Sequence, residues 1–528
     1  MSEMLPMGWY IANIESIISN TGIFIDGDWV ESKDQDPNGK IRLLQLADIG
    51  DGAFINKSNR FVNEEAFSRL KCTSILPGDV LVARMPFPLG RACVLPAITY
   101  KAITVVDVCI IRPNKMYTNA TWLMYFVNAS EYRNKIEALS SGTTRQRISR
   151  KNLGLIPLPL PPFNEQKRIV AKLDAIIPRI DSVKSRLDKV PAILKRFRQS
   201  VLTAAVTGKL TEKWREENPD VESAEKLLER IREERVYRYQ KECEIAKKNG
   251  DGKPKKPENL NPSPLKNDDN DIPISWVRAT FCDISSTRHY AMSSGPFGSA
   301  LGTKDYQNAG IPVIRGQNIQ PGKFSNLNYV YISEAKAEEL NRSKTQSGDI
   351  VIVAVGAGVG NSAIIPDSIK SAILSQNCNK FTIDSQVALN SYILSALQIS
   401  IIRTQMDEST TDTARQFLSL TNLKNMFFPL PPLEEQHEIV RQVEKLLALA
   451  DKLEQHYQKA KARVDKLSQS VLAKAFRGEL VPQDPTDEPA EKLLERIMAE
   501  KEKLSQGAKS PREKKKRQAV ACDVTIAS

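Results

Sequence analysis

Apolar residues recur at alternating steps of three and four along two long stretches of the chain, which predicts long helices that pack against each other in a coiled coil. The first helix is expected to run from about residue 164 to 206, roughly 65 Å at 1.5 Å per residue. Pro178 and Pro191 should kink or break it. Ordinary amphipathic packing within a globular domain is the alternative, but the length and duplication of the pattern favour paired helices. The apolar positions are Leu173, Ile176, Ile180, Val183, Leu187, Val190, Leu194, Phe197 and Val201 in the first stretch, and Val443, Leu446, Ala450, Leu453, Tyr457, Ala460, Val464, Leu467 and Val471 in the second.

Shorter runs rich in β-branched residues lie outside these stretches and predict strands. Gly, Pro and Asn residues separate the runs, as they do in loops. A short helix is expected over Thr121–Ser130. These regions are therefore expected to be α+β domains with long loops. The predicted strands are Val80–Ala83, Thr104–Ile111, Ile350–Val355 and Lys380–Ile383.

Internal repetition is the most informative feature of the chain. The sequence Pro-Leu-Pro-Pro, followed by Glu-Gln and Ile-Val, occurs at 159–162 and again at 429–432, an offset of 429 − 159 = 270. Ordered matches at nearly one offset indicate an A-B-A′-B′ chain, in which the A segments diverge and the B segments stay similar. Further pairs are 199–202 with 469–472, 224–231 with 490–497, 78–80 with 348–350, Arg145-Gln146 with Arg415-Gln416, and Trp9 with Trp276.

The repeat divides the chain into two α+β domains, each followed by a helical spacer. A proline-containing linker with few apolar residues separates the two halves, and a run of basic residues follows the second spacer. We expect the basic end to be a solvated, disordered tail, with weak phosphate contact as the alternative. The predicted ranges are 1–155 and 272–427 for the domains, 156–246 and 428–505 for the spacers, 247–271 for the linker and 506–528 for the tail.

The charge balance suggests a polyanionic partner. The net charge is +12, which favours nucleic acid without distinguishing DNA from RNA. Seven scattered cysteines, without a C-x-x-C pair, predict reduced thiols in a cytoplasmic protein. The first residues have no apolar signal-peptide core, and the apolar run 350–360 is too short to span a bilayer.

Motifs for catalysis are missing from the sequence. The chain has three histidines, no H-E-x-x-H motif, no Cys/His cluster and no G-x-x-x-x-G-K-[ST] loop. The N-P-P-[YF] tetrapeptide of amino-methyltransferases is also absent. Gly356, Gly358 and Gly360 follow a predicted strand, but their spacing is not G-x-G-x-x-G, so a tight loop is expected. We therefore predict no catalytic residue, no metal site and no cofactor on this chain. His437 and His456 are expected to be solvated on the second long helix.

With its P-L-P-P-x-x-E-Q openings, Q-S-V-L blocks and A-E-K-L-L-E-R-I blocks, the chain resembles the specificity subunit of type I restriction-modification systems from Leu5 to about Lys503. The stretches 295–299 (Gly-Pro-Phe-Gly-Ser), 311–315 and 348–350 are similar to the family's target-recognition domain pattern. The first domain lacks the Gly-Pro-Phe-Gly-Ser stretch, so its opening loop should differ in shape.

The resemblance implies two target-recognition domains, each of which reads one half of a bipartite, asymmetric double-stranded DNA site. It also implies that the helical segments are antiparallel coiled-coil helices with pseudo-two-fold symmetry, which hold the domains apart and bind two DNA adenine methylation subunits. Restriction and translocation subunits can join such a complex. S-adenosylmethionine, ATP and Mg²⁺ would then belong to the partner subunits.

Side chains suited to base edges and phosphates are the candidate DNA contacts. Arg145-Gln146 and Arg415-Gln416 occur in both copies, so a shared role such as phosphate contact or architecture suits them better than sequence reading. Two other functions remain open: a self-sufficient nuclease or methyltransferase, and a non-catalytic coiled-coil scaffold or RNA-binding repeat protein. The candidates are Lys57, Arg60, Arg84, Arg91, Arg145, Arg147 and Arg150 in the first domain, and Lys304, Arg315, Gln317, Asn318, Asn361, Arg415 and Gln416 in the second.

Overall fold

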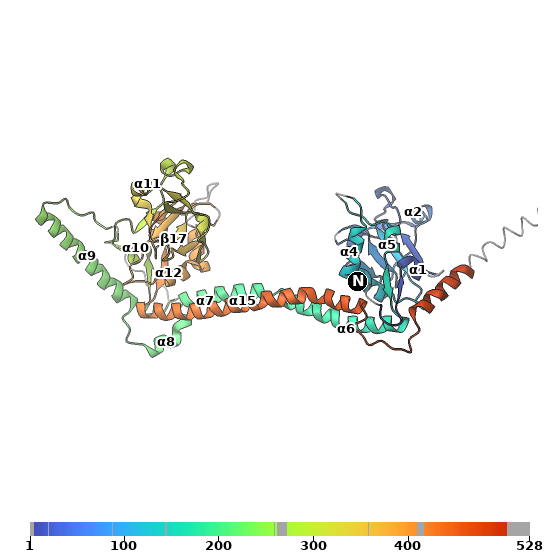
Figure 1. Cartoon of the computed structure of the whole chain (residues 1–528). Helices are drawn as coiled ribbons and strands as arrows, with labels where there is room; N and C mark the ends of the chain where they lie inside the picture. The colour runs from blue at the N-terminus through green and yellow to red at the C-terminus, as the bar shows by residue number, and fades with distance from the viewer. Residues whose placement is uncertain are drawn as a thin grey trace, which may run out of the picture. The chain divides into compact units, whose positions relative to one another are not determined.

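Each of the two structural units combines segments from both halves of the chain (Figure 1). The first unit takes the residues up to 188 and those from 458 onward, and the second takes residues 189–457. The structure is a computed structural model. It contains both helices and strands, and some of the helices are long. The described residues are 5–18, 21–86, 88–142, 145–257, 259–260, 272–356, 358–408 and 417–503.

The domain of the first unit contains three small sheets. A four-stranded antiparallel sheet has the order β2-β8-β5-β6, a three-stranded sheet has the order β4-β3-β7, and β1 pairs with β9. The strands are β1 (Tyr10–Ala12), β2 (Ile23–Asp26), β3 (Ile41–Leu44), β4 (Phe61–Val62), β5 (Val80–Ala83), β6 (Ala92–Val94), β7 (Ala102–Thr104), β8 (Val108–Arg112) and β9 (Leu158–Leu160). The helices are α1 (Ile14–Ile17), α2 (Glu64–Arg69), α3 (Ala120–Asn128), α4 (Ser130–Ala138) and α5 (Arg150–Leu155).

The domain of the second unit repeats this plan, with sheets β11-β20-β17-β18, β15-β12-β19-β16 and β10-β21, and adds the pair β13-β14. Its strands are β10 (Val277–Thr280), β11 (Met292–Ser294), β12 (Ile311–Ile314), β13 (Ile319–Gln320), β14 (Lys323–Phe324), β15 (Val330–Ile332), β16 (Lys344–Thr345), β17 (Ile350–Val353), β18 (Ser362–Ile364), β19 (Ala372–Leu374), β20 (Cys378–Phe381) and β21 (Phe427–Leu430). Its helices are α10 (Phe281–Ile284), α11 (Glu334–Glu339), α12 (Asn390–Leu397), α13 (Ser400–Glu408) and α14 (Leu420–Lys424).

Strand registers show how closely the domains correspond. Leu43 lies opposite Ile103 in a parallel pair, and Val313 lies opposite Ile373 in the equivalent pair. Both partners follow the repeat offset (313 − 43 = 373 − 103 = 270). The divergence of the two A sequences therefore leaves this strand pairing unchanged, although the second domain adds β16 to the sheet. Three predicted strands need correction. Thr104–Ile111 is divided between β7 and β8 by a turn, β17 ends at Val353 rather than 355, and the strand predicted over Lys380–Ile383 is β20, which covers Cys378–Phe381.

The long helices differ between the copies. The first is divided into α6 (Phe163–Leu187) and α7 (Val190–Val206), and the break falls just before Pro191. Pro178 lies inside α6, where it does not end the helix. The second, α15 (Leu433–Phe476), is continuous over 44 residues. Two further helices, α8 (Glu212–Glu217) and α9 (Ala224–Asn249), follow α7, and residues 490–503 form the last described helix.

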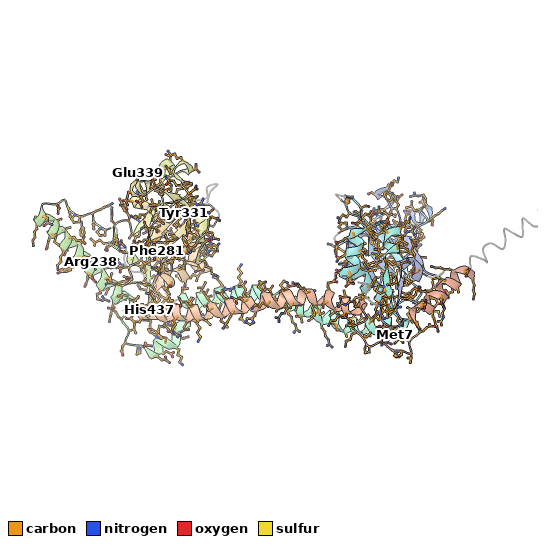
Figure 2. All side chains as sticks on the ribbon, in the orientation of Figure 1. Met7, Arg238, Phe281, Tyr331, Glu339 and His437 are labelled. Atoms are coloured by element: carbon orange, nitrogen blue, oxygen red, sulfur yellow. The ribbon has the colours of Figure 1, made fainter. Side chains whose placement is uncertain are left out.

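Side-chain contacts join α15 to its neighbour within each unit, and in the first unit their order along the two helices is antiparallel. In the first unit, Lys184 Nζ lies 3.2 Å from Ser468 Oγ and Lys461 Nζ lies 2.7 Å from Asp188 Oδ1. In the second, Arg198 Nη2 lies 2.7 Å from Asp451 Oδ1. Three predicted seam positions are nevertheless exposed, namely Val183, Leu453 and Leu467. His437, labelled in Figure 2, and His456 are exposed on α15 as expected.

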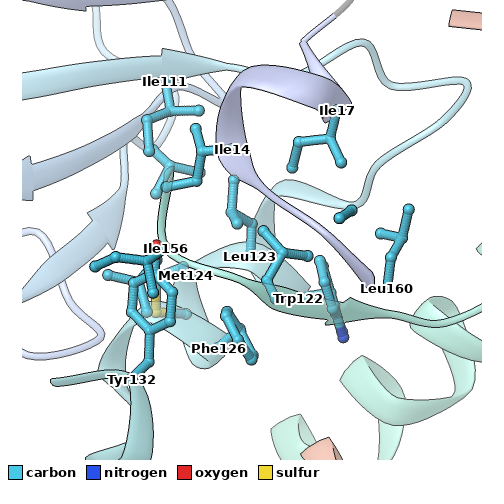
Figure 3. Close-up of a cluster of buried hydrophobic side chains, with 14 of the residues drawn as sticks. Ile14, Ile17, Ile111, Trp122, Leu123, Met124, Phe126, Tyr132, Ile156 and Leu160 are labelled. Atoms are coloured by element: carbon cyan, nitrogen blue, oxygen red, sulfur yellow. The ribbon is translucent and has the colours of Figure 1, made fainter. Parts of the chain in front are cut away.

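The far end of each long helix packs into a domain core. In the first unit, Leu472 and Phe476 of α15 and Leu493 of the last helix join the cluster around Trp122, whose neighbours appear in Figure 3. Phe476 meets the ring of Phe126 at 5.0 Å between centroids. In the second unit, the corresponding residues come from α7 and α9, among them Leu202, Val206 and Leu227. Each domain core is therefore completed by the spacer that belongs to the other copy.

A buried tryptophan–carboxylate pair joins the start of each domain to the start of the long helix behind it. Trp9 Nε1 donates to Glu165 Oε2 at 2.9 Å, and Trp276 Nε1 donates to Glu435 Oε2 at 2.8 Å. Both carboxylates are almost fully buried. Within the described part of the chain, an ion pair is found at Glu435 and not at Glu165: Arg215 Nη1 lies 2.6 Å from Glu435 Oε1. Burial raises the pKa of Glu165, although the Trp9 hydrogen bond opposes this effect.

The same substitution at these equivalent positions should therefore have different effects on stability. Glu165→Gln keeps an acceptor for Trp9 and removes a buried charge, so the free energy of unfolding at pH 7.5 should stay level or rise. Glu435→Gln deprives Arg215 of its carboxylate and should lower it by about 1–3 kcal/mol. Thermal and denaturant unfolding of both variants would test this, and an equal loss of stability in the two would contradict it.

Candidate nucleic-acid interface

The first domain carries a groove of about 900 Å³. Its walls come from the loop that follows β2, the start of the segment after β3, the turn between β7 and β8, and the turn before α5. The chemistry is mixed, because arginines, carboxylates, amides and an indole meet in one depression. The lining residues are Asp28, Trp29, Val30, Glu31, Ser32, Gln35, Gln45, Leu46, Ala47, Met85, Val105, Val106, Asp107, Arg145 and Arg147.

Two of the predicted DNA-contacting residues lie in this groove. Arg145 is exposed, and Arg147 is half-buried with its guanidinium 3.2 Å from Asp107. Arg60 is also exposed and donates to Gln35, another lining residue, at 2.7 Å. The structure therefore brings together basic side chains that lie far apart in the sequence (145 − 60 = 85).

Two other candidates of the first domain are exposed. Lys57 lies in the segment between β3 and β4. Arg150 begins α5, where its guanidinium donates to the Phe24 carbonyl at 2.8 Å and lies over the Phe24 ring. Both can present a positive charge to solvent, although the Arg150 side chain also contacts Phe24 of its own domain.

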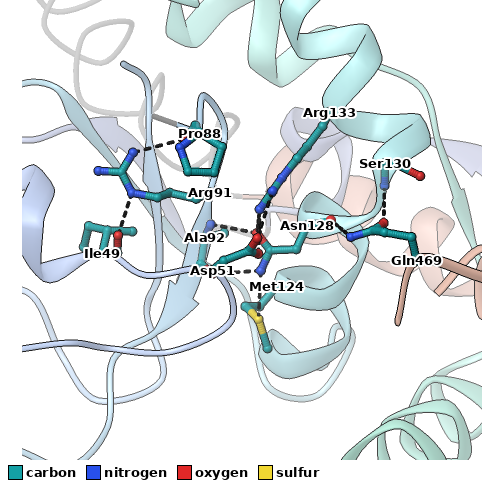
Figure 4. Close-up of polar contacts among 10 residues, drawn as sticks. All are labelled: Ile49, Asp51, Pro88, Arg91, Ala92, Met124, Asn128, Ser130, Arg133 and Gln469. Carbon is teal, nitrogen blue, oxygen red and sulfur yellow. Dashed lines mark hydrogen bonds and ion pairs between the residues drawn. The ribbon is translucent and has the colours of Figure 1, made fainter. Parts of the chain in front are cut away.

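Arg84 and Arg91 were predicted to contact DNA, but each is more than nine-tenths buried and serves the fold. Arg84 forms an ion pair with Asp26 at 3.0 Å. Arg91 donates to the Ile49 carbonyl at 2.6 Å and to the Pro88 carbonyl at 3.1 Å (Figure 4). Residue type alone predicts a DNA contact for an arginine. In the structure, however, these two guanidinium groups donate hydrogen bonds to backbone carbonyl oxygens of neighbouring loops.

The second domain places its candidates in a different pattern. Gln317 and Lys304 are exposed, and Arg315 is half-buried. Arg315 and Gln317 both donate to the Asn328 carbonyl, Gln317 at 3.0 Å. They therefore lie together at the end of β12. Arg415 and Gln416 lie outside the described residues.

Asn318 and Asn361 have local structural roles. Asn318 is fully buried and its amide donates to the Ser325 and Leu327 carbonyls, so in this structure it supports the loop and is not exposed for contact with DNA. Asn361 is half-buried in the glycine-rich turn, where its backbone N–H donates to the Gly358 carbonyl at 2.9 Å. The glycines after β17 thus form a tight turn, as expected.

Asp28 gives the groove a carboxylate with an unusual pKa. Burial raises the pKa of Asp28 to about 6, against the opposing effect of hydrogen bonds from the Thr73 backbone and Cys72. Glu31 and Asp107 add further negative charge at the rim. A carboxylate in such a place can accept a hydrogen bond from the N4 amino group of cytosine, which is how Asp and Glu read that base.

Sequence reasoning missed the exposed aromatic residues, because it searched for polar and basic side chains. Trp29 lines the groove and is 67% exposed. Phe297 of the second domain is 65% exposed. The sequence pattern that could have indicated them is an aromatic residue two positions after a glycine, which occurs in each A segment at 27–29 and 295–297.

Among the described residues, no group of three or more His, Cys, Asp or Glu side chains could hold a metal ion. The six described cysteines form no disulfide with one another. No helix in the described ranges is both long and apolar enough to cross a membrane.

Comparison with known proteins points to one family. The model of the type I restriction modification DNA specificity domain matches residues 20–192 and 298–462. The type I restriction enzyme EcoKI specificity subunit of Escherichia coli (strain K12) is 32% identical over 541 residues, covering 97% of this chain and 99% of that protein. The EcoBI specificity subunit of Escherichia coli is 33% identical over 449 residues, covering 83% of each.

Solved structures agree on the fold. The HsdS subunit from Thermoanaerobacter tengcongensis superposes with a TM-score of 0.55 at 18% identity, covering 91% of this chain and 99% of that one. A chain from a study of the assembly and conformational transition of the type I R-M system gives a TM-score of 0.60 at 18% identity, covering 90% of this chain and 100% of that one. The present chain belongs to the type I restriction-modification DNA specificity family, whose members are the DNA-recognition components of these systems.

The raised pKa of Asp28 predicts a pH-dependent effect of Asp28→Asn. The folded pKa of about 6 exceeds the ordinary value of 3.8, so the protonated form is favoured in the folded state. The Asp28 charge therefore destabilises the fold increasingly as the pH rises from about 4 to 6, and fully above that range. With allowance for solvent screening of this half-buried group, Asp28→Asn should raise the free energy of unfolding by about 1–2 kcal/mol at pH 7.5 and leave it unchanged near pH 4. Denaturant unfolding at both pH values measures the difference, and a pH-independent effect would contradict the assignment.

Proposed function

We propose that this chain selects a bipartite, asymmetric DNA site, each domain reading one half of it. The observation that carries the proposal is that the two domains share a fold framework but carry different residues at candidate DNA-contacting positions. Residues that build the framework are the same at equivalent positions, as for Asp79 and Asp349, which accept from the backbone N–H of Leu76 and Gln346. Candidate contact residues differ at the same offset, as for Gln45 and Arg315 or Arg60 and Val330. Two readers of equal shape and unequal chemistry would select unlike half-sites.

The helical segments act as the spacer between the two readers. Antiparallel contacts on α15, together with buried seam residues such as Leu173, Ala450 and Tyr457, support an antiparallel coiled coil. The chain passes from one unit to the other at 188–189 and again at 457–458. Two helical connections in opposite directions suit a pseudo-two-fold arrangement, which the local two-fold symmetry of duplex DNA would match.

Exposed apolar residues on the long helices would bind the adenine methylation subunits. Val183 on α6 is 43% exposed, and Leu453 on α15 is 49% exposed. The two positions are equivalent in the repeat (453 − 183 = 270). Both residues occupy predicted seam positions, and apolar side chains at such positions normally pack against a partner helix, which favours a protein partner here. Because the two positions are equivalent, they favour two copies of the same subunit.

The catalytic groups would belong to the partners. A complex of this kind takes S-adenosylmethionine on its methylation subunits, and ATP and Mg²⁺ on any restriction subunit that joins. The present chain would contribute sequence selection without catalysis, in the cytoplasm where the DNA lies.

Exchanging one domain tests this division of labour. A variant in which residues 1–155 are replaced by the corresponding domain of a relative should, together with the methylation subunit, methylate sites with one new half and one unchanged half. Methylated adenines are mapped across a genome exposed to each complex, and the chain without its partner serves as the control, for which no methylation is expected. A change in both halves, or methylation by the purified chain alone, would overturn the proposal.

A further inference from the structure

Two glycines mark the same place in the two domains, although their offset differs from that of the rest of the repeat. The Gly27 N–H donates to the Val108 carbonyl at 2.8 Å, and the Gly295 N–H donates to the Cys378 carbonyl at 2.9 Å. The two acceptor residues are separated by the same 270 residues as the rest of the repeat (378 − 108 = 270). The two glycines are separated by 268 residues, two fewer (295 − 27 = 268). The first domain therefore has a shifted counterpart of the Gly-Pro-Phe segment that its sequence was expected to lack.

Both glycines are needed for a close approach of backbone to backbone. A Cβ atom on Gly27 would lie 2.2 Å from the Val105 carbonyl oxygen, and one on Gly295 would lie 1.8 Å from the Ser375 carbonyl oxygen. Such contacts cannot be accommodated without movement of the backbone. Each glycine directly follows a strand, and the two strands end opposite equivalent residues, Asp26 opposite Cys109 and Ser294 opposite Asn379. The residue two positions after each glycine therefore lies equally far along the chain from the end of its strand.

That residue is aromatic and exposed in both domains. Trp29 and Phe297 are 67% and 65% exposed, whereas Trp9, Trp122 and Trp276 are each at most 6% exposed. Large aromatic side chains normally bury most of their surface, and holding two of them in solvent at equivalent positions favours a ligand.

We infer that Trp29 and Phe297 are equivalent DNA-contacting residues, each packing its ring against bases of the half-site that its own domain reads. The inference rests on the proposed function. Trp29 lies in the groove with Arg145 and Arg147, so a ring and two guanidinium groups face one depression. Arginines supply phosphate and guanine contacts, and an aromatic ring supplies the apolar contact that distinguishes a thymine methyl group. The different rings suit different half-sites.

The test compares Trp29→Ala and Phe297→Ala in the complex with the methylation subunit, using duplexes that carry the bipartite site found by methylation mapping. Each substitution should weaken binding to the intact site by about tenfold. With the half-site of the first domain scrambled, Trp29→Ala should have no further effect while Phe297→Ala keeps its full effect, and the reverse should hold for the other half. Tyr237→Ala on α9, where the ring is 57% exposed and outside the groove, is the matched control and should bind like the wild type.

The possible failures can be separated. If the wild-type complex does not prefer the intact site over doubly scrambled DNA, the proposed function fails. If it does, and Trp29→Ala binds the intact site as tightly as the wild type, the inference fails. Loss of the methylation subunit from either variant in size-exclusion chromatography would assign the rings to a protein partner and also overturn the inference. Both side chains are exposed, so unchanged thermal unfolding is expected and serves as the check on folding.

Discussion

The structure depends on the burial of each spacer's far end in the core of the other copy's domain. Phe476 is more than nine-tenths buried beside Trp122 and Phe126, and Val206 occupies the equivalent place in the second unit. Truncating a buried Phe or Val in a close-packed core commonly costs several kcal/mol, so these contacts bind the two halves of the repeat firmly together. Neither half of the chain contains a complete domain core. Both halves of the repeat are therefore needed to complete either domain core.

The buried tryptophan–carboxylate pairs explain why the Pro-Leu-Pro-Pro segment precedes Glu-Gln. The segment forms β9 or β21, which pairs with the first strand of its domain and brings Trp9 or Trp276 beside the carboxylate. Gln166 and Gln436 then accept from the backbone of Asn119 and Leu389, which start α3 and α12. One short motif thus joins the domain entry, the long helix and the central helix of the domain. Sequence periodicity predicted only that a helix begins there.

Repetition and periodicity predicted the two domains of mixed structure and the long helices, because both signals are local or internal to the chain. They could not show which spacer completes which core, since that depends on contacts between distant segments, as between Ser130 and Gln469 (469 − 130 = 339). Among the site residues, Arg145 and Arg147 lie together in a groove, whereas Arg84, Arg91 and Asn318 are buried. Residue type identifies groups that can bind DNA, but neighbouring loop carbonyls compete for the same donors. The sequence did not indicate that Trp29 and Phe297 are equivalent, because they are separated by 268 residues rather than by the repeat offset of 270.

The proposal that paired helices separate two DNA-reading domains is tested most directly by changing the length of those helices. Four residues would be inserted at the break between α6 and α7, between 188 and 189, and four within α15, between 457 and 458. Each insertion would add about 6 Å if helical, close to the length of two base pairs at about 3.4 Å each. Methylated adenines would be mapped for this variant in complex with the methylation subunit. The account predicts unchanged half-sites separated by one or two additional base pairs. An active complex that still methylated only sites with the original gap would contradict it.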